Sequence, residues 1–133
     1  MKVVSEEEML KFGESFGASL RAPMVIELVG DVGAGKTTLV RGIAKGLGVK
    51  EPVTSPSFTI SKSYAYNGGV LTHYDFYRLP DPGIMMEDLA ESIAEPHTIT
   101  IVEWADTVED ILPSDCKKIH IKYNDDGSRE IEL

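Results

Sequence analysis

Residues 24–38 read MVIELVGDVGAGKTT, an apolar run followed by a loop rich in glycine. The loop fits the pattern G-x-x-x-x-G-K-T through Gly30, Gly35, Lys36 and Thr37. Glycines allow backbone conformations closed to other residues, so successive N–H groups can turn inward and form a nest for anionic oxygens. The lysine adds a positive charge for the β- and γ-phosphates, and the threonine hydroxyl can bind Mg²⁺. The stretch therefore predicts a site for nucleotide phosphates and their metal.

The elements on either side of this loop are those that a phosphate loop requires. MVIELV reads as a buried strand, and residues 36–47 (KTTLVRGIAKGL) read as a helix that ends at the following glycine. An earlier helix is predicted after Ser5, because Glu8 completes a capping-box signal. Its apolar face comes from residues at steps of three and four: Met9, Phe12, Phe16 and Leu20. Beside that face, Gly13 and Gly17 would let a neighbouring element approach closely.

The rest of the chain alternates short strands and helices. Two runs rich in β-branched and aromatic residues, 58–66 and 70–77, flank an Asn-Gly-Gly turn and predict a hairpin. The remaining expected elements are a helix at 86–94, an apolar strand at 98–104, a short helix at 105–112 and a second hairpin from 117–123 and 128–133. This order predicts an α/β fold of the P-loop NTPase type, with a mixed, mostly parallel central sheet flanked by helices and with antiparallel hairpins added. We expect a single P-loop ATPase domain over residues 1–133.

Composition narrows the functional classes. The formal net charge of −9 repels a phosphate backbone, so in a nucleic-acid pathway we expect another subunit to carry the nucleic acid. The simpler interpretation is that the acidic surface only keeps the protein soluble. No run is long enough to cross a bilayer, and the N-terminus lacks the features of a secretory signal. With Cys116 as the only cysteine, no internal disulfide is possible, and a cytoplasmic location is expected.

A hydrolytic nucleotide site also needs an acidic residue beside the metal, at the end of an apolar strand. Glu103 ends the run TITIV, which is apolar enough for the sheet centre, and is favoured. Asp75 lies in the more polar run LTHYDFY and is the second candidate. Two structural alternatives stay open: Asp75 as a surface acid in a hairpin, and Glu103 as a cap of the next helix. His73 is expected to pack, and the spacing of the histidines predicts no metal set.

Residues 55–59 (SPSFT) stand where a switch loop would follow the first helix of a P-loop fold. Thr59 or a neighbouring hydroxyl would then sense the γ-phosphate. Serine- and proline-rich loops are common, so this segment alone does not establish a switch. The chain has no N-K-x-D sequence of the kind that reads guanine, so adenine is the preferred base.

The motifs are more informative together. GDVGAGKTT, SPSFTI, HYDFYRL and IVEWAD, in that order and spacing, resemble the TsaE (YjeE) family of bacterial P-loop ATPases, which take part in forming threonylcarbamoyladenosine in tRNA. The resemblance runs from the first helix to about residue 106, and the last 27 residues carry no recognised motif. The Walker stretch is shared with many ATPases, whereas the other motifs together are specific to this family.

The resemblance implies ATP and Mg²⁺ as cofactors. The residues expected around the phosphates are Asp31, Val32, Gly33, Ala34, Gly35, Lys36, Thr37 and Thr38. Thr37 and Glu103 would place Mg²⁺, while Lys36, Asp75 and Glu103 would serve hydrolysis. The resemblance leaves open whether Asp75 orders the metal's water or the attacking water.

The resemblance also assigns roles away from the phosphates. Thr59 would belong to a switch, and Trp104 would respond to the state of the nucleotide. Met9 and Phe12 would lie near the base. Members of the family bind a TsaB–TsaD pair, so this protein is expected to reach tRNA only indirectly and to need no membrane.

Two other functions share the phosphate site. A small-molecule P-loop kinase usually has an arginine-bearing lid, but the one plausible lid, residues 80–96, is acidic and contains no Lys or Arg. A module that senses ATP without hydrolysis could discard both Asp75 and Glu103. Of the four arginines, only Arg78 is expected near the site, so we expect slow turnover until a partner completes it.

Overall fold

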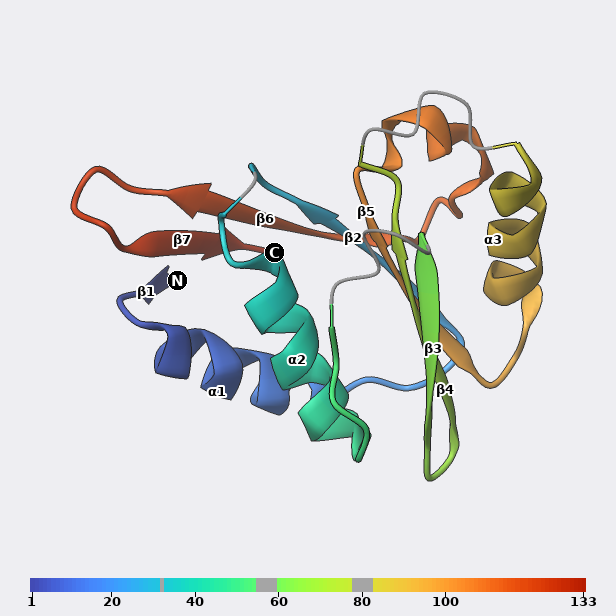
Figure 1. Cartoon of the computed structure of the whole chain (residues 1–133), viewed down its shortest axis with the longest axis horizontal. Coiled ribbons are helices and arrows are strands. Elements are labelled where there is room, and N and C mark those ends of the chain that lie inside the picture. The colour runs from blue at the N-terminus through green and yellow to red at the C-terminus, as the bar shows by residue number, and fades with distance from the viewer. Residues whose placement is uncertain (32, 55–59, 78–82) are drawn as a thin grey trace.

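The computed structural model describes residues 1–31, 33–54, 60–77 and 83–133. Within them lies a seven-stranded sheet of order β1-β7-β6-β2-β5-β4-β3 (Figure 1). The strands are β1 (Lys2–Val3), β2 (Met24–Val29), β3 (Ser61–Tyr66), β4 (Gly69–Asp75), β5 (Thr98–Glu103), β6 (Lys117–Tyr123) and β7 (Arg129–Glu132). The inner strands β6, β2, β5 and β4 are parallel neighbours, and β3, β7 and β1 add antiparallel pairs at the two edges. The predicted mixed α/β sheet with added hairpins is confirmed.

Helices cover both faces of this sheet. One apolar cluster joins the sheet to α1 (Glu6–Ala18) and α2 (Lys36–Leu47). A second cluster, on the opposite face, includes side chains of α3 (Ile84–Ala94) and of the 3₁₀ turns η1 (Ala105–Thr107) and η2 (Glu109–Ile111). Side chains alternate between faces along β2, so Ile26 and Leu28 join the first cluster and Val25 joins the second.

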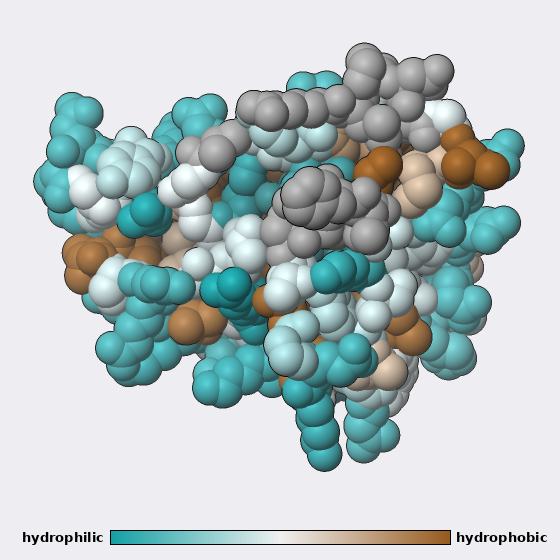
Figure 2. Space-filling model, in the orientation of Figure 1, coloured by the Kyte–Doolittle hydropathy of each residue, from teal (hydrophilic) through white to brown (hydrophobic). Residues whose placement is uncertain are grey.

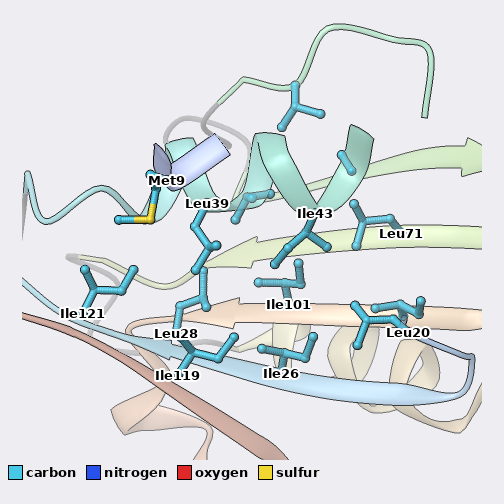
Figure 3. Close-up of a cluster of buried hydrophobic side chains, with 14 of the residues drawn as sticks. Met9, Leu20, Ile26, Leu28, Leu39, Ile43, Leu71, Ile101, Ile119 and Ile121 are labelled. Atoms are coloured by element: carbon cyan, nitrogen blue, oxygen red, sulfur yellow. The ribbon is translucent and has the colours of Figure 1, made fainter. Parts of the chain in front are cut away.

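The first cluster fixes the position of α2 over the sheet. In Figure 3, Leu39 and Ile43 point from α2 toward Leu28 and Ile101 on the strands. All four side chains are at most 1% exposed, and burial of such a side chain contributes roughly 1.5–3 kcal/mol. Because α2 is fixed, its first turn lies at the same edge of the sheet as the carboxyl ends of β2, β4 and β5.

The contact between α1 and α2 depends on glycine. A Cβ added at Gly17 would lie 2.3 Å from the carbonyl oxygen of Ile43, and one added at Gly46 would lie 2.1 Å from that of Glu14. No side chain fits at those distances, so the two helices pack backbone to backbone here. The predicted close approach at Gly13 and Gly17 is confirmed, with α2 as the neighbour.

Most element boundaries lie within about two residues of those expected from the sequence. Ser5 caps α1 by accepting a hydrogen bond from the Glu8 amide, and α2 begins and ends at the predicted residues. The helix expected at 105–112 is wrong, because η1 and η2 form there instead. Ala105 and Val108 are both buried in the second cluster, and a 3₁₀ turn brings residues three apart onto one side. Tertiary burial therefore outweighs the helical pattern of this segment.

The N-terminal strand β1 is not evident in the sequence. It pairs with β7 through Val3 and Arg129, and the Met1 ammonium donates a 2.9 Å hydrogen bond to the Ile131 carbonyl. Figure 1 shows both termini beside the β6–β7 hairpin. A two-residue strand carries too little local pattern to be found, and its partner lies more than a hundred residues away.

Candidate functional site

The sheet edge below the first turn of α2 contains a pocket of about 650 Å³. Elements that are distant in sequence meet there: the phosphate loop, the start of α1, the ends of β4 and β5, and β7. The residues that line it are Ser5, Glu6, Met9, Gly33, Gly35, Lys36, Thr37, Thr38, Asp75, Tyr77, Glu103, Trp104 and Arg129. Ligands bind at this edge in open α/β sheets, because the carboxyl ends of parallel strands leave a crevice there.

The phosphate loop has the conformation that its glycines predict. Gly33 and Gly35 have φ values of 83° and 103°, in the left-handed region that favours glycine. Gly35 begins α2, and its carbonyl oxygen accepts the first helical hydrogen bond from Leu39. The first amides of any α-helix have no intrahelical acceptor, and the helix dipole makes this end positive. The loop can therefore bind an anion.

Two of the residues expected at the phosphates shape this loop without lining the pocket. The Ala34 amide donates a 3.0 Å hydrogen bond to the carbonyl oxygen of Asp31, which closes a turn between them. Ala34 is 2% exposed, and the side of the loop at Asp31 borders a smaller hollow. The predicted role of Val32 concerns a residue outside those that the structure describes.

Lys36 lies at the base of the pocket and is only 7% exposed. Its ammonium donates a 2.5 Å hydrogen bond to the Gly30 carbonyl and lies 3.9 Å from Oε1 of Glu103. It also lies 3.8 Å from the centre of the Trp104 ring, in cation–π contact. Burial lowers the pKa of Lys36, while Glu103 and other nearby acids oppose that shift. The Lys36 ammonium is therefore kept at the pocket by these contacts, of which the hydrogen bond to the Gly30 carbonyl can be exchanged for one to a phosphate oxygen.

Asp75 and Glu103 are neighbours at the strand ends. They pair directly in the parallel register of β4 and β5, and both line the pocket. Burial raises the pKa of Asp75 most, and the negative charge of Glu103 raises it further. Of the alternatives left open, the surface acid is wrong for Asp75, since β4 is an inner strand and Asp75 is half-buried.

His73 forms a hydrogen bond with Glu103. A 2.5 Å hydrogen bond joins His73 Nε2 to Oε2 of Glu103, and the His73 side chain is fully buried. The expectation that His73 only packs is therefore incomplete. The signal was its position two residues before Asp75, which places both side chains on the same face of β4. This bond orients the Glu103 carboxylate.

The oxygens at this edge fit Mg²⁺ as a companion of phosphate. They are the hydroxyl of Thr37 and the carboxylates of Asp75 and Glu103, and Mg²⁺ prefers such hard ligands together with water and substrate phosphates. Among the described residues, no group of three or more His, Cys, Asp or Glu side chains could hold a metal ion by itself. An Mg²⁺ ion at these oxygens would take its remaining ligands from water and from the phosphates of a nucleotide.

The chain resembles known proteins over nearly its whole length. The family model described as "Threonylcarbamoyl adenosine biosynthesis protein TsaE" matches residues 3–131, nearly the whole chain. The chain belongs to the TsaE family. It is 40% identical over 133 residues to a Bacillus subtilis protein named tRNA threonylcarbamoyladenosine biosynthesis protein TsaE, covering 98% of this chain and 81% of that one.

Further relatives agree. A Nostoc sp. protein with the same TsaE name is 37% identical over 134 residues, covering 98% of this chain and 82% of the relative. The crystal structure of Bacillus subtilis YdiB superposes with a TM-score of 0.83 at 35% identity, covering 98% of this chain and 80% of that chain. The fold, including the C-terminal hairpin that carries no recognised motif, is therefore that of a known TsaE-like structure.

Of the other residues expected from the TsaE resemblance, some line the pocket and some do not. Met9 lines the pocket, whereas Phe12 stacks on Phe16 at 6.1 Å and packs against the first core cluster. Trp104 has a left-handed φ of 56° and contacts Tyr77, with 4.8 Å between ring centres. Thr59 and the switch expected around it lie outside the described residues.

The expectation that only Arg78 lies near the site is wrong. Arg129, on the last strand, lines the pocket, while Arg78 is outside the described residues. No local pattern marks Arg129, because only the sheet order brings β7 to the phosphate loop. In the described part of the chain, no helix is long and apolar enough to cross a membrane.

Proposed function

We propose that this protein is a Mg²⁺-dependent P-loop ATPase that supports the formation of threonylcarbamoyladenosine in tRNA, together with a TsaB–TsaD-type complex. One observation carries the enzymatic part of the proposal. A nest of backbone amides with a buried lysine faces a pair of strand-end carboxylates across one pocket. The role in tRNA modification follows from membership of the TsaE family.

In this proposal the chain's own residues position the triphosphate. The loop amides and the first turn of α2 bind the phosphate oxygens, and the Lys36 ammonium leaves the Gly30 carbonyl to meet the β- and γ-phosphates. Thr37 and Glu103 would hold Mg²⁺, which would neutralise charge on the phosphates. His73 keeps the Glu103 carboxylate in a single orientation.

Asp75 acts on water. Its Oδ1 accepts a 2.9 Å hydrogen bond from the Tyr77 amide, which fixes the direction of the carboxylate at the pocket wall. We assign it to ordering water at the reaction centre, where the water oxygen attacks the γ-phosphorus and the bond to ADP breaks. Such reactions depend mainly on positioning and on stabilising spreading negative charge.

We expect the isolated protein to hydrolyse ATP slowly. The Arg129 guanidinium, the one described arginine at the pocket, already bonds to the phosphate loop. An arginine supplied by a partner raises turnover in NTPases of this kind by about three to five powers of ten. A partner complex that completes the site would therefore link hydrolysis to tRNA modification.

The kinase alternative has less support. The acidic segment that could have formed a lid is largely α3, whose Leu89 is fully buried on the opposite face of the sheet. Incubation with ATP and a panel of metabolites separates the two reactions. Free phosphate supports the ATPase, and a phosphorylated metabolite would contradict it.

The roles of the site residues are tested by substitution. Lys36→Ala should weaken ATP binding and abolish turnover, while Asp75→Ala should retain most binding and lose turnover by at least about a hundredfold. Glu103→Ala should weaken the dependence on Mg²⁺. Binding is followed by calorimetry and turnover by phosphate release, with and without TsaB–TsaD. If Asp75→Ala hydrolyses ATP at an unchanged rate, Asp75 has no part in the mechanism. If the unmodified protein hydrolyses ATP equally fast with and without TsaB–TsaD, the partners do not complete the site.

A further inference from the structure

Arg129 joins the C-terminal hairpin to the phosphate loop. Its Nε donates a 3.1 Å hydrogen bond to the carbonyl oxygen of Ala34, and its Nη2 donates one of 3.2 Å to that of Gly33. The two carbonyls belong to consecutive residues of the loop, 95 and 96 positions away in the sequence. The planar fork of a guanidinium suits two adjacent acceptors, which a single ammonium cannot match.

These bonds determine where loop amides point. In a trans peptide the C=O and the following N–H lie in one plane and point in opposite directions, so a fixed carbonyl also fixes the direction of the amide that follows it. The bond to Ala34 thus sets the direction of the Gly35 N–H, at the glycine that begins α2. The peptide before it is held on both sides, since its amide donates to Asp31 and its carbonyl accepts from Arg129.

Arg129 is itself held in place. Its guanidinium carbon lies 4.7 Å from the centre of the Tyr123 ring, and Nη1 donates a 3.4 Å hydrogen bond to the Gly127 carbonyl. Its backbone pairs with Tyr123 of β6 on one side and with Val3 of β1 on the other. The side chain therefore presents its donors to the loop from a braced position.

We propose that Arg129 is a positioning residue, through which the C-terminal hairpin holds the phosphate loop in its anion-binding conformation. This inference rests on the proposed nucleotide site and adds a residue that lies outside every motif of the chain. It assigns a role to the C-terminal segment, whose sequence carries no recognised signal. The guanidinium acts by geometry, through the two carbonyls, and not as a general positive charge near the phosphates.

The test compares ATP·Mg²⁺ with tripolyphosphate·Mg²⁺, which has the phosphates but no base. Binding of each to the full chain is measured by calorimetry for the unmodified protein, Arg129→Ala, Arg129→Lys and the control Lys122→Ala. Lys122 lies on the same hairpin, is exposed, and forms an ion pair with Glu132 at 3.4 Å. We expect Arg129→Ala to lower the affinity for both ligands by the same factor, about ten- to a hundredfold. Arg129→Lys should restore only a small part of that affinity. The control should bind both ligands as the unmodified protein does.

Several results would overturn the inference. They are unchanged tripolyphosphate affinity in Arg129→Ala, full recovery in Arg129→Lys, or a loss seen with ATP alone, which would indicate a base contact. Hydrogen exchange adds a readout without ligand: amides of residues 33–37 should exchange faster in both Arg129 variants, while those of α1 stay unchanged. If Arg129→Ala does not fold, Arg129→Lys decides through the same two measurements. Failure of the unmodified protein to bind either ligand would instead refute the proposed nucleotide site.

Discussion

Glu27 is a buried carboxylate that the nucleotide site does not use. It lies on β2 and is 5% exposed, and the Lys118 ammonium is 3.7 Å from its Oε1. Burial raises the pKa of Glu27 above its usual 4.5, and the negative charge of Glu109 raises it further. The ion pair with Lys118 only partly offsets these effects, so the ionised form of Glu27 is less favourable in the folded state than in the unfolded chain.

Glu27→Gln should therefore stabilise the protein at neutral pH. Because the folded-state pKa is raised, the folded state binds the proton more tightly, and this stabilisation is present at low pH and lost as pH rises above about 4.5. The amide that replaces the Glu27 carboxylate stays neutral at every pH, so the variant does not lose this stability. We expect Glu27→Gln to melt about 2–4 °C higher than the unmodified protein at pH 7 and at the same temperature near pH 4. Thermal melts at the two pH values measure this, with the exposed Glu51→Gln as control. A difference independent of pH would contradict it.

At the scale of the element, glycines that face each other allow the short distance between helices α1 and α2. The distance between these helices also affects the functional site. The phosphate loop leads into the first turn of α2, and α1 brings Met9 to the pocket. A change in the distance between the two helices would therefore alter the shape of the pocket.

Gly17→Ala tests this contact through the sign of its effect. In an exposed helix, replacing glycine by alanine stabilises by about 1 kcal/mol. Here the new Cβ would lie 2.3 Å from the Ile43 carbonyl oxygen, so we expect destabilisation of about 1–3 kcal/mol instead. Chemical denaturation measures it, and Ser15→Ala, at an exposed position of the same helix, should not destabilise. A more stable Gly17→Ala protein would show that the helices are not in close contact.

At the scale of the whole molecule, acidic charge dominates. The net charge is −9, and Figure 2 shows a face covered mostly by hydrophilic residues. A surface of this sign gains little from the release of counterions around a nucleic acid. The basic groups at the pocket, Lys36 and Arg129, are engaged with the phosphate loop and do not form a surface patch.

The isolated protein should therefore not bind tRNA. We expect a dissociation constant weaker than about 10⁻⁴ M at physiological salt, the weak end of non-specific binding. Fluorescence anisotropy of labelled tRNA measures this, and addition of a TsaB–TsaD complex should bring the protein to the tRNA. Micromolar binding by the protein alone would contradict the proposal that tRNA is reached only through partners.

The phosphate loop and its two flanking elements were predictable from the sequence. The strand, the left-handed glycines and the start and end of α2 depend on interactions between residues a few positions apart, so their pattern is local. The same holds for the Ser5 cap of α1 and for Gly13 and Gly17, whose small size was visible without their partner. Asp75 and Glu103 were candidates because each stands near the end of a predicted strand, and the family resemblance added others, among them Met9 and Trp104.

Only the tertiary structure decided how the distant parts of the site meet. The parallel pairing of β4 with β5 sets Asp75 beside Glu103 and places His73 beneath it, and the position of β7 brings Arg129 to the loop. The same packing turned the expected helix after Trp104 into 3₁₀ turns. The sequence determined the local phosphate-binding element, because backbone conformation and capping depend on near neighbours. The sheet order determined the rest, because it depends on burial and on pairing between strands that are far apart in the sequence, such as β1 with β7.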